Sequence, residues 1–298
     1  MAGARVIFPC GGNEKYRVFS YCKAEYAGGM KIQFLGAAGE VTGSRHSVEV
    51  FLSGRARRFM VDFGMFQGGR EATNKNLETL PFPAKDLDFV VLTHAHIDHS
   101  GNLPTLVKNG YNGQILCTSA TADLSQLLLT DSVNVFLAKN KGDKKSRRHK
   151  NEFKQAPLYL HKHVMDTMDR FFCIPFHKKF EARPNLSITL IPAGHLLGAA
   201  AILLEIKEAE SIKRVAFSGD IGRYNYPILA DPETISDVDY LICESTYGDR
   251  LHEVDIDAEL HLLNVVRNTC VEKKGKLIIP AFSVGRTQEI LFELNQLS

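Results

Sequence analysis

The chain has 298 residues, with 36 Lys and Arg against 34 Asp and Glu and a formal net charge of +2 at pH 7. Hydrophobic residues make up 44% and charged residues 23%, which is ordinary for a globular protein and excludes disordered and fibrous classes. Because the charges nearly balance, a nucleic-acid binder of this composition needs a local basic patch.

The sequence carries no sign of export or membrane insertion. No run approaches the roughly 18 apolar residues of a membrane span, and the N-terminus lacks the apolar core of a signal peptide. The six cysteines are scattered, without a C-x-x-C pair. We therefore expect reduced thiols, a cytoplasmic location and no membrane partner.

The predicted elements begin after a glycine-rich stretch at 1–29, which we expect to be a disordered N-terminal extension. Short β-rich runs bounded by Gly and Pro then predict strands. A helix is predicted over 121–137 from its apolar spacing, and the basic stretch 139–150 follows as a solvated loop or a contact to a polyanion. The predicted strands are 31–35, 47–52, 58–61, 89–93, 114–117, 171–174, 186–191, 199–206, 214–218 and 240–243.

After residue 243 the pattern changes to a helix (254–270), a strand (276–280) and a second helix (284–297). This βα alternation is typical of a parallel sheet. We therefore divide the chain into the extension 1–29, a first domain at 30–243 and the start of a second domain at 244–298.

The strongest chemical signal is T-H-A-H-I-D-H-S at 93–100, directly after an apolar strand. Three imidazoles and a carboxylate within six residues suit a borderline metal such as Zn²⁺. On an extended segment His94 and His96 point to the same side and can share one ion. Asp98 and His99, at the start of the following helix, can reach a second ion.

Two residues farther along the chain are expected at the same centre. His195 lies in a glycine-flanked turn between two strands and is predicted as a ligand. Asp220 ends a strand in F-S-G-D-I-G-R and is suited to bridge two cations. Asp62, in M-V-D-F-G, is expected to orient a ligand rather than to bind metal itself. Six other histidines are expected to have ordinary structural or surface roles: His46, His149, His161, His163, His177 and His261.

Two cations a few ångströms apart define a reaction type. A bridging water with a lowered pKa becomes hydroxide at neutral pH, and both ions stabilise the charge that develops on a phosphoryl or carbonyl oxygen. The motif thus indicates a dinuclear metallohydrolase, with Asp98 as a catalytic carboxylate, without selecting the substrate.

Through these ligands the sequence resembles the metallo-β-lactamase superfamily. Further segments resemble its β-CASP branch of RNA-processing nucleases: G-A-A-G-E-V-T-G-S, V-D-F-G-M-F-Q-G, A-G-H-L-L-G-A-A, S-G-D-I-G-R, C-E-S-T-Y-G-D-R-L-H and P-A-F-S-V-G-R-T-Q-E. The resemblance implies an α/β fold, an αββα sandwich followed by the beginning of an inserted α/β β-CASP domain. The implied activity is endonucleolytic or exonucleolytic hydrolysis of RNA phosphodiester bonds.

The resemblance also implies roles for single residues. One Zn²⁺ would be held by His94, His96, His195 and Asp220, and the other by Asp98, His99 and the shared Asp220. Glu244 matches the first acidic motif of the β-CASP domain, a catalytic position that orients a histidine. His252 is a weaker candidate for a residue that supports the metal ligands or contacts the phosphate.

Substrate contacts are expected from Arg223, Ser283 and Arg286, with free N–H groups at 283–287 facing a phosphate. Family members carry two further histidines downstream, so we expect this chain to be a fragment of a longer protein. Two alternatives remain: a thioester or lactam hydrolase of the same superfamily, and a non-catalytic RNA-binding subunit. RNA is the expected partner, and a homodimer is left open.

Overall fold

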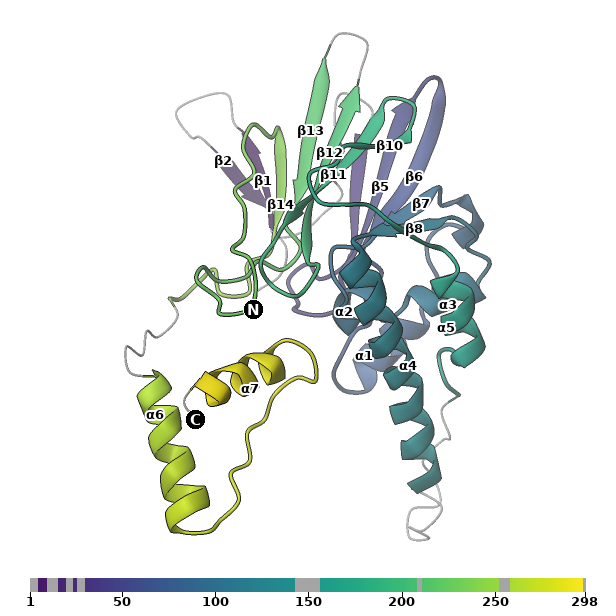
Figure 1. Ribbon diagram of the computed structural model, residues 1–298. Helices are drawn as coiled ribbons and strands as arrows, with labels where there is room; N and C mark the ends of the chain where they lie inside the picture. The colour runs from purple at the N-terminus through teal and green to yellow at the C-terminus, as the bar shows by residue number, and fades with distance from the viewer. Residues whose placement is uncertain are drawn as a thin grey trace.

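The computed structural model describes residues 30–142, 156–207, 211–251 and 258–296, together with three short strands at 5–9, 16–19 and 24–25. In this part of the chain two seven-stranded sheets lie face to face (Figure 1). The first sheet has the order β10 (Phe180–Arg183), β11 (Leu186–Pro192), β12 (Ala200–Lys207), β13 (Ile212–Phe217), β14 (Tyr240–Cys243), β1 (Arg5–Pro9) and β2 (Tyr16–Phe19).

The second sheet follows the chain order from β3 to β9. Its strands β6, β7, β8 and β9 are parallel, whereas β3 to β6 pair antiparallel. The ten strands expected before residue 244 all occur, with ends shifted by a few residues. The bounds in this sheet are Ala24–Glu25, Met30–Gly36, Arg45–Leu52, Arg55–Val61, Phe89–Val91, Gln114–Cys117 and Phe171–Cys173.

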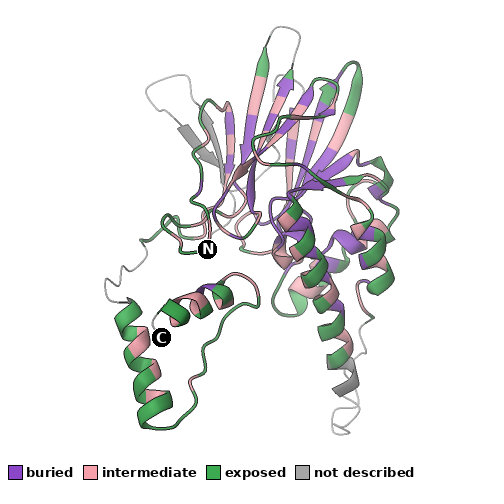
Figure 2. Ribbon diagram, in the orientation of Figure 1, coloured by how far each residue is buried: buried purple, intermediate pink, exposed green. Residues whose placement is uncertain are grey.

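The main core fills the space between the two sheets. Alternating side chains such as Val48 and Val50 of β5 meet Ile202 and Leu204 of β12, and all four are at most 1% exposed. Figure 2 shows these inward positions as buried segments on both sheets. Along these strands β-branched and leucine side chains alternate with polar ones. Because successive side chains point to opposite faces of a strand, this alternation places the apolar face of each sheet in the core.

Helices cover the outer face of the second sheet and form a second apolar layer with it. Leu103 and Leu106 of α3 pack on Val90 and Ile115, which point outward from β7 and β8. This two-sheet α/β architecture confirms the predicted fold class, and the described helices supply one of its two outer layers. The helices here are α1 (Arg70–Leu77), α2 (Ile97–Ser100), α3 (Leu103–Lys108), α4 (Ser119–Gly142) and α5 (His161–Met168), with a 3₁₀ turn at Ala84–Asp86.

The three described strands within residues 1–29 differ from the disordered extension expected there. Strand β1 pairs antiparallel with β14 and with β2, and β3 pairs with β4. The β-branched and aromatic residues in R-V-I-F-P and Y-R-V-F favour strands, a signal that the surrounding glycines obscured.

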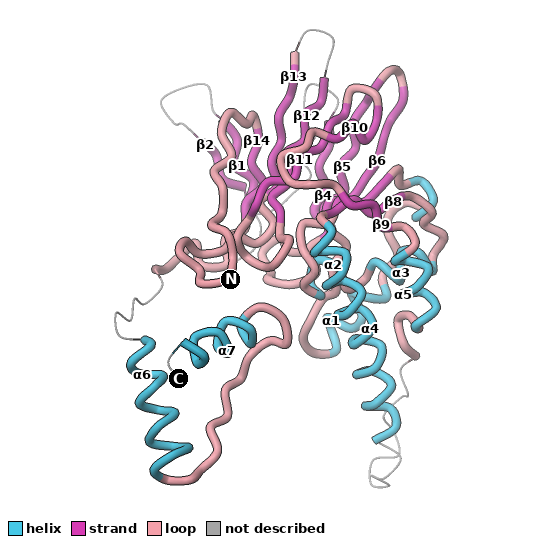
Figure 3. The backbone as a smooth tube through the Cα atoms, viewed as in Figure 1, coloured by secondary structure: helices cyan, strands magenta, loops and turns pink. Residues whose placement is uncertain are grey.

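The segment after residue 257 lies below the sheets in Figure 1 and contains α6 (Ala258–Val266), a π-helical stretch (Arg267–Glu272) and α7 (Arg286–Gln296). The strand predicted at 276–280 is wrong: Figure 3 draws this stretch as a loop. A strand needs a neighbour for its backbone groups, and no described strand lies beside this segment. Its apolar side chains are open to solvent, with Ile278 86% exposed.

None of the helices among the described residues is long and apolar enough to cross a membrane.

Candidate metal centre

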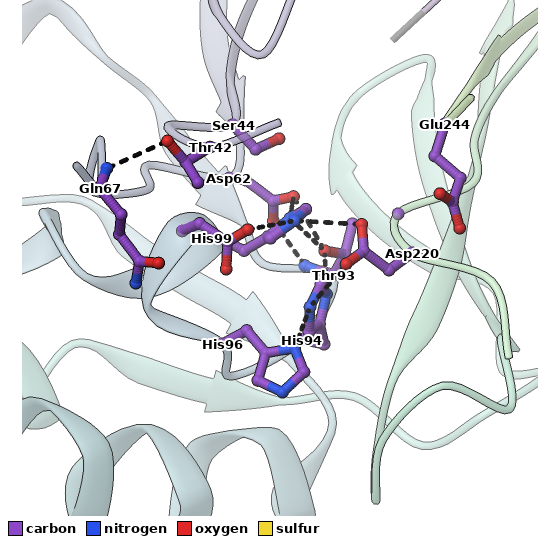
Figure 4. A network of polar contacts seen from close by, with 12 residues as sticks. Thr42, Ser44, Asp62, Gln67, Thr93, His94, His96, His99, Asp220 and Glu244 are labelled. Carbon is purple, nitrogen blue, oxygen red and sulfur yellow. Dashed lines mark hydrogen bonds and ion pairs between the residues drawn. The ribbon is translucent and has the colours of Figure 1, made fainter. Parts of the chain in front are cut away.

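The candidate site gathers the loops that follow parallel strands. Asp62 follows β6 and His94 follows β7 in the second sheet, while Asp220 and Glu244 follow β13 and β14 in the first. Because parallel strands end at the same edge, each sheet delivers two of these side chains to one place. His195 enters from the turn between β11 and β12. Figure 4 shows Asp62, His94 and Asp220 converging from these separate loops.

The His195 loop and the Asp220 loop touch through their backbones. Gly222 donates its N–H to the carbonyl of Ala193 at 2.8 Å, and a Cβ on Gly222 would lie 1.8 Å from the carbonyl oxygen of Gly194. Only glycine therefore permits this approach. The sequence places both functional residues one to two positions from these glycines, and the loop contact sets their separation.

Three imidazoles and one carboxylate face a common point. His96 Nδ1 lies 3.2 Å from His94 Nε2 and 3.1 Å from His195 Nε2. Asp220 Oδ2 lies 3.7 Å from His94 Nε2 and 3.5 Å from His195 Nε2. All four candidate ligand atoms lie within 4.8 Å of one another.

Asp98 and His99 lie next to this group on the short helix α2, ahead of the helix on which the sequence placed them. His99 Nε2 is 3.2 Å from Asp220 Oδ1 and 4.0 Å from Asp98 Oδ2. Asp220 thus turns one oxygen to the histidine trio and the other to His99. This is the arrangement that a bridging carboxylate requires.

Asp62 contacts two of these groups from behind. Its carboxylate accepts hydrogen bonds from the Thr93 N–H (2.7 Å), the Thr93 hydroxyl (2.8 Å) and His99 Nδ1 (2.7 Å). The Thr93 hydroxyl is also 3.0 Å from His94 Nδ1. A hydroxyl that donates to Asp62 accepts from His94, so His94 carries its proton on Nδ1 and presents the Nε2 lone pair to the centre. His99 likewise carries a proton on Nδ1, which it donates to Asp62. Asp62 itself lies in the left-handed region at φ 58°.

Burial and charge set the protonation of the cluster. Burial, together with the neighbouring histidines, lowers the pKa of His94 well below its usual value and that of His96 to about 4. Burial also lowers the pKa of His99, but Asp220 and Asp62 outweigh it and hold that pKa well above its usual value. Burial raises the pKa of Asp98.

These residues fit divalent metal ions. His96 Nδ1 faces two imidazole nitrogens and can donate a hydrogen bond to only one of them. Without a metal ion, the lone pair of the other nitrogen is therefore left without a hydrogen-bond donor among these rings. Three carboxylates lie close to His99, whose extra proton supplies positive charge opposite them. A metal cation at His99 Nε2 would supply that positive charge in place of the proton. Nitrogen and carboxylate ligands in this number suit Zn²⁺.

A cavity of about 50 Å³ lies on the other side of His99 and Asp220. Glu244 lines it and accepts a hydrogen bond from the Ile221 N–H at 2.7 Å; no histidine among the described residues hydrogen-bonds to its carboxylate. His46 also lines it, although the sequence gave no reason to single this residue out. His46 is 5% exposed, its Nδ1 makes no hydrogen bond within the described part of the chain, and burial lowers its pKa to about 4.

The residues predicted to contact substrate bond to side chains of α7. Arg223 and Arg286 both contact Glu289, at 3.5 and 2.6 Å, and remain 53% and 48% exposed. The carbonyl of Ser283 accepts a hydrogen bond from the Gln288 side chain. His252 lies outside the described residues.

Sequence reasoning missed three residues besides His46. Thr93 links Asp62 to His94, Val284 packs on the apolar cluster of Ala95, Ala193, Leu196 and Ala199, and buried Glu289 contacts both arginines. The threonine stood inside the recognised motif, but backbone and long-range contacts leave no residue-type signal.

Comparison with known proteins agrees with this geometry. Residues 45–150 match the metallo-β-lactamase superfamily. The chain is 34% identical over 265 residues to ribonuclease TTHA0252 of Thermus thermophilus, covering 89% of this chain and 54% of that protein. It is 33% identical to the transcription termination factor FttA of Methanocaldococcus jannaschii, covering 90% and 39% of the two chains. It is 30% identical to the endoribonuclease YSH1 of Kluyveromyces lactis, covering 88% and 32%.

The chain thus spans about half, or less, of the length of these curated relatives. In shape it is similar to a metallo-β-lactamase mutant of Cronobacter sakazakii, with a TM-score of 0.42, 13% identity and coverage of 90% and 92%. The superfamily match and the three relatives confirm the resemblance inferred from the motifs. The chain belongs to the metallo-β-lactamase superfamily, in its β-CASP branch.

Proposed function

We propose that the protein is a metal-dependent hydrolase that cleaves RNA phosphodiester bonds, acting in RNA processing or decay. The observation that carries the proposal is the convergence of three histidine nitrogens and Asp220 within 4.8 Å, beside Asp98 and His99. Relatives named as a ribonuclease and an endoribonuclease support RNA as the substrate.

Zinc is the proposed metal, held by the residues predicted from the sequence. His94, His96, His195 and Asp220 would hold one ion, and Asp98, His99 and Asp220 the other. When bound, the ions lower the pKa of water and supply positive charge opposite the reacting phosphate.

The chain's own residues orient the metal ligands and exchange protons with the substrate water. Asp62 fixes the Nδ1 tautomer of His99 and, through Thr93, that of His94. Asp98 is the carboxylate proposed to accept a proton from the attacking water, because burial raises its pKa. Glu244 lines the cavity beside Asp220, where its negative charge would repel the phosphates of a polyanion from that side.

The substrate track is proposed to include Arg223, Ser283 and Arg286. About half of each arginine side chain is exposed while it contacts Glu289, which leaves N–H donors for a phosphate. Four free cysteines among the described residues support the proposal of a cytoplasmic location. A homodimer remains a prediction.

The test is cleavage of a labelled single-stranded RNA by the purified chain with zinc, with a chelator, and after His96→Ala. The matched control is His161→Ala, which removes an exposed histidine from α5. We expect chelator-sensitive cleavage that His96→Ala abolishes and His161→Ala preserves. Hydrolysis of a thioester or lactam without RNA cleavage would replace the proposal with the first alternative. RNA binding without metal-dependent cleavage would replace it with the second.

A further inference from the structure

Two arginines from distant parts of the chain meet at one carboxylate. Arg223 belongs to the loop after β13, and Arg286 begins α7. Glu289 accepts a hydrogen bond from Arg286 Nη1 at 2.6 Å and one from Arg223 Nη2 at 3.5 Å. The Tyr226 hydroxyl donates a third at 2.6 Å, and its ring centroid lies 5.1 Å from the Arg223 guanidinium. We call Arg223, Tyr226, Arg286 and Glu289 the Glu289 clamp.

The charges of the clamp differ in their exposure to solvent. Glu289 is 4% exposed, whereas the side chains of Arg223 and Arg286 are 53% and 48% exposed. A carboxylate this buried requires its cationic and hydroxyl partners, because an unpaired buried charge is costly. The clamp therefore holds its one negative charge inside and presents two guanidinium groups at the surface.

Both segments of the clamp rest on the turn between β11 and β12, which carries one histidine of the candidate metal centre. Gly222, the residue before Arg223, donates its N–H to the carbonyl of Ala193 in this turn at 2.8 Å. Val284, two residues before Arg286, packs on the apolar cluster that includes Ala193. The two arginines are thus anchored beside the centre from two independent directions.

A cationic pair at this place suits the phosphates of a strand that reacts at the metal centre. Each guanidinium carries five N–H donors, and its bond to Glu289 uses one nitrogen, so further donors can reach a phosphate. An arginine that is mobile before binding loses side-chain freedom when a phosphate immobilises it, and this loss weakens affinity. A carboxylate that already holds both guanidinium groups reduces the loss.

We propose that Glu289 is a positioning residue for substrate binding: it holds Arg223 and Arg286 as a preorganised pair that binds an RNA backbone phosphate next to the reacting one. The inference deepens the proposed function and rests on it, because RNA is the ligand. It predicts an effect opposite in sign to that of charge. By charge alone the carboxylate of Glu289 repels RNA, whereas by positioning the two arginines it strengthens RNA binding.

The test compares Glu289→Gln with Glu293→Gln, which removes the same charge one turn farther along α7, outside the clamp. Tyr226→Phe is the milder variant, because it deletes one hydroxyl and keeps both the ring and the charge. Binding of a labelled single-stranded RNA is titrated with a chelator present and at a series of salt concentrations. Cleavage of the same RNA with zinc is measured separately, and thermal unfolding shows that each variant is folded.

We expect Glu289→Gln to bind RNA about tenfold more weakly than the wild type, although it removes a negative charge. The slope of log K against log salt concentration should become shallower by about one, the change expected when one phosphate contact is lost. Glu293→Gln should bind at least as tightly as the wild type, with the same slope. Tyr226→Phe should show a smaller loss than Glu289→Gln.

A double-mutant cycle separates positioning from a general loss of structure. Arg286→Ala should weaken RNA binding in the wild type and have little further effect in Glu289→Gln. If Glu289→Gln fails to fold, Tyr226→Phe and its combination with Arg286→Ala decide the question. Unchanged or tighter RNA binding in the folded clamp variants would overturn the inference and leave the proposed cleavage intact. Clamp-dependent RNA binding by a protein that never cleaves RNA would retain the inference and refute the proposed function.

Discussion

Replacing Asp62 by Asn tests whether this carboxylate sets the protonation of the centre. Asp62 is 1% exposed and accepts three hydrogen bonds, two from Thr93 and one from His99, all between 2.7 and 2.8 Å. An amide of the same shape accepts through one end only. Either the Thr93 N–H or His99 Nδ1–H then faces a second donor and loses its acceptor.

The free-energy cost of Asp62→Asn follows from the hydrogen bonds that it loses. An unsatisfied buried donor costs about 1–3 kcal/mol, so Asp62→Asn is expected to lower the free energy of unfolding by that amount. When the amide faces His99, the imidazole moves its proton to Nε2, the nitrogen that faces Asp220. Loss of such a partner typically weakens metal binding about 10–100-fold, and we expect this loss for the ion at Asp98, His99 and Asp220.

The assay is zinc binding by competition titration, alongside urea unfolding of the metal-free protein. Asp88→Asn is the control, because Asp88 is also a partly buried acceptor, of Arg57 and Arg183, but lies away from the centre. It should lower stability and leave zinc affinity unchanged. Unchanged zinc affinity in Asp62→Asn, with the expected loss of stability, would refute the reasoning about tautomers.

Other predictions concern stability and the metal. Burial holds the pKa of His46 at about 4 in the folded chain, against 6.5 when unfolded. The unfolded state therefore binds more protons between these values, and stability present above pH 6.5 is lost as the pH falls toward 4, by about 3 kcal/mol at most. Urea unfolding of metal-free protein across this window should show a flatter profile for His46→Gln, and an identical profile would contradict the assignment. Arg45 donates to the Gly64 carbonyl and to Asn76 Oδ1 and lies 4.6 Å from the ring centroids of Phe63 and Phe66. Arg45→Lys should lower the free energy of unfolding by about 2 kcal/mol, because lysine lacks the planar fork; a loss below a few tenths would contradict this. His195→Ala should abolish zinc binding at the histidine trio, measured by metal content after dialysis, and retention of all bound zinc would contradict the ligand set.

The sequence predicted strands such as β5 and β11 well because their apolar residues alternate with polar ones. It failed at 276–280, where Leu277, Ile278 and Ile279 have strand composition but no described partner strand. It also missed strand β1 within 1–29, because its pairing with β14 depends on residues more than 200 positions away in the chain.

The ligand candidates were accessible from sequence because His94, His96, Asp98 and His99 occur within six residues. Asp220 and His195 were found through glycine-flanked strand ends. The contacts behind them were not accessible. In the sequence Glu289 is an ordinary helical acid, and only the fold buries it beside Arg223 and Arg286. Such roles depend on tertiary contacts rather than on residue type.

The most direct test of the metal centre is a crystal structure of the zinc-loaded protein with anomalous data at the zinc edge. The account predicts a peak about 2.0–2.1 Å from His94 Nε2, His96 Nδ1 and His195 Nε2, with Asp220 as a further ligand. Zinc found elsewhere on the chain, with these nitrogens uncoordinated at full zinc occupancy, would contradict it.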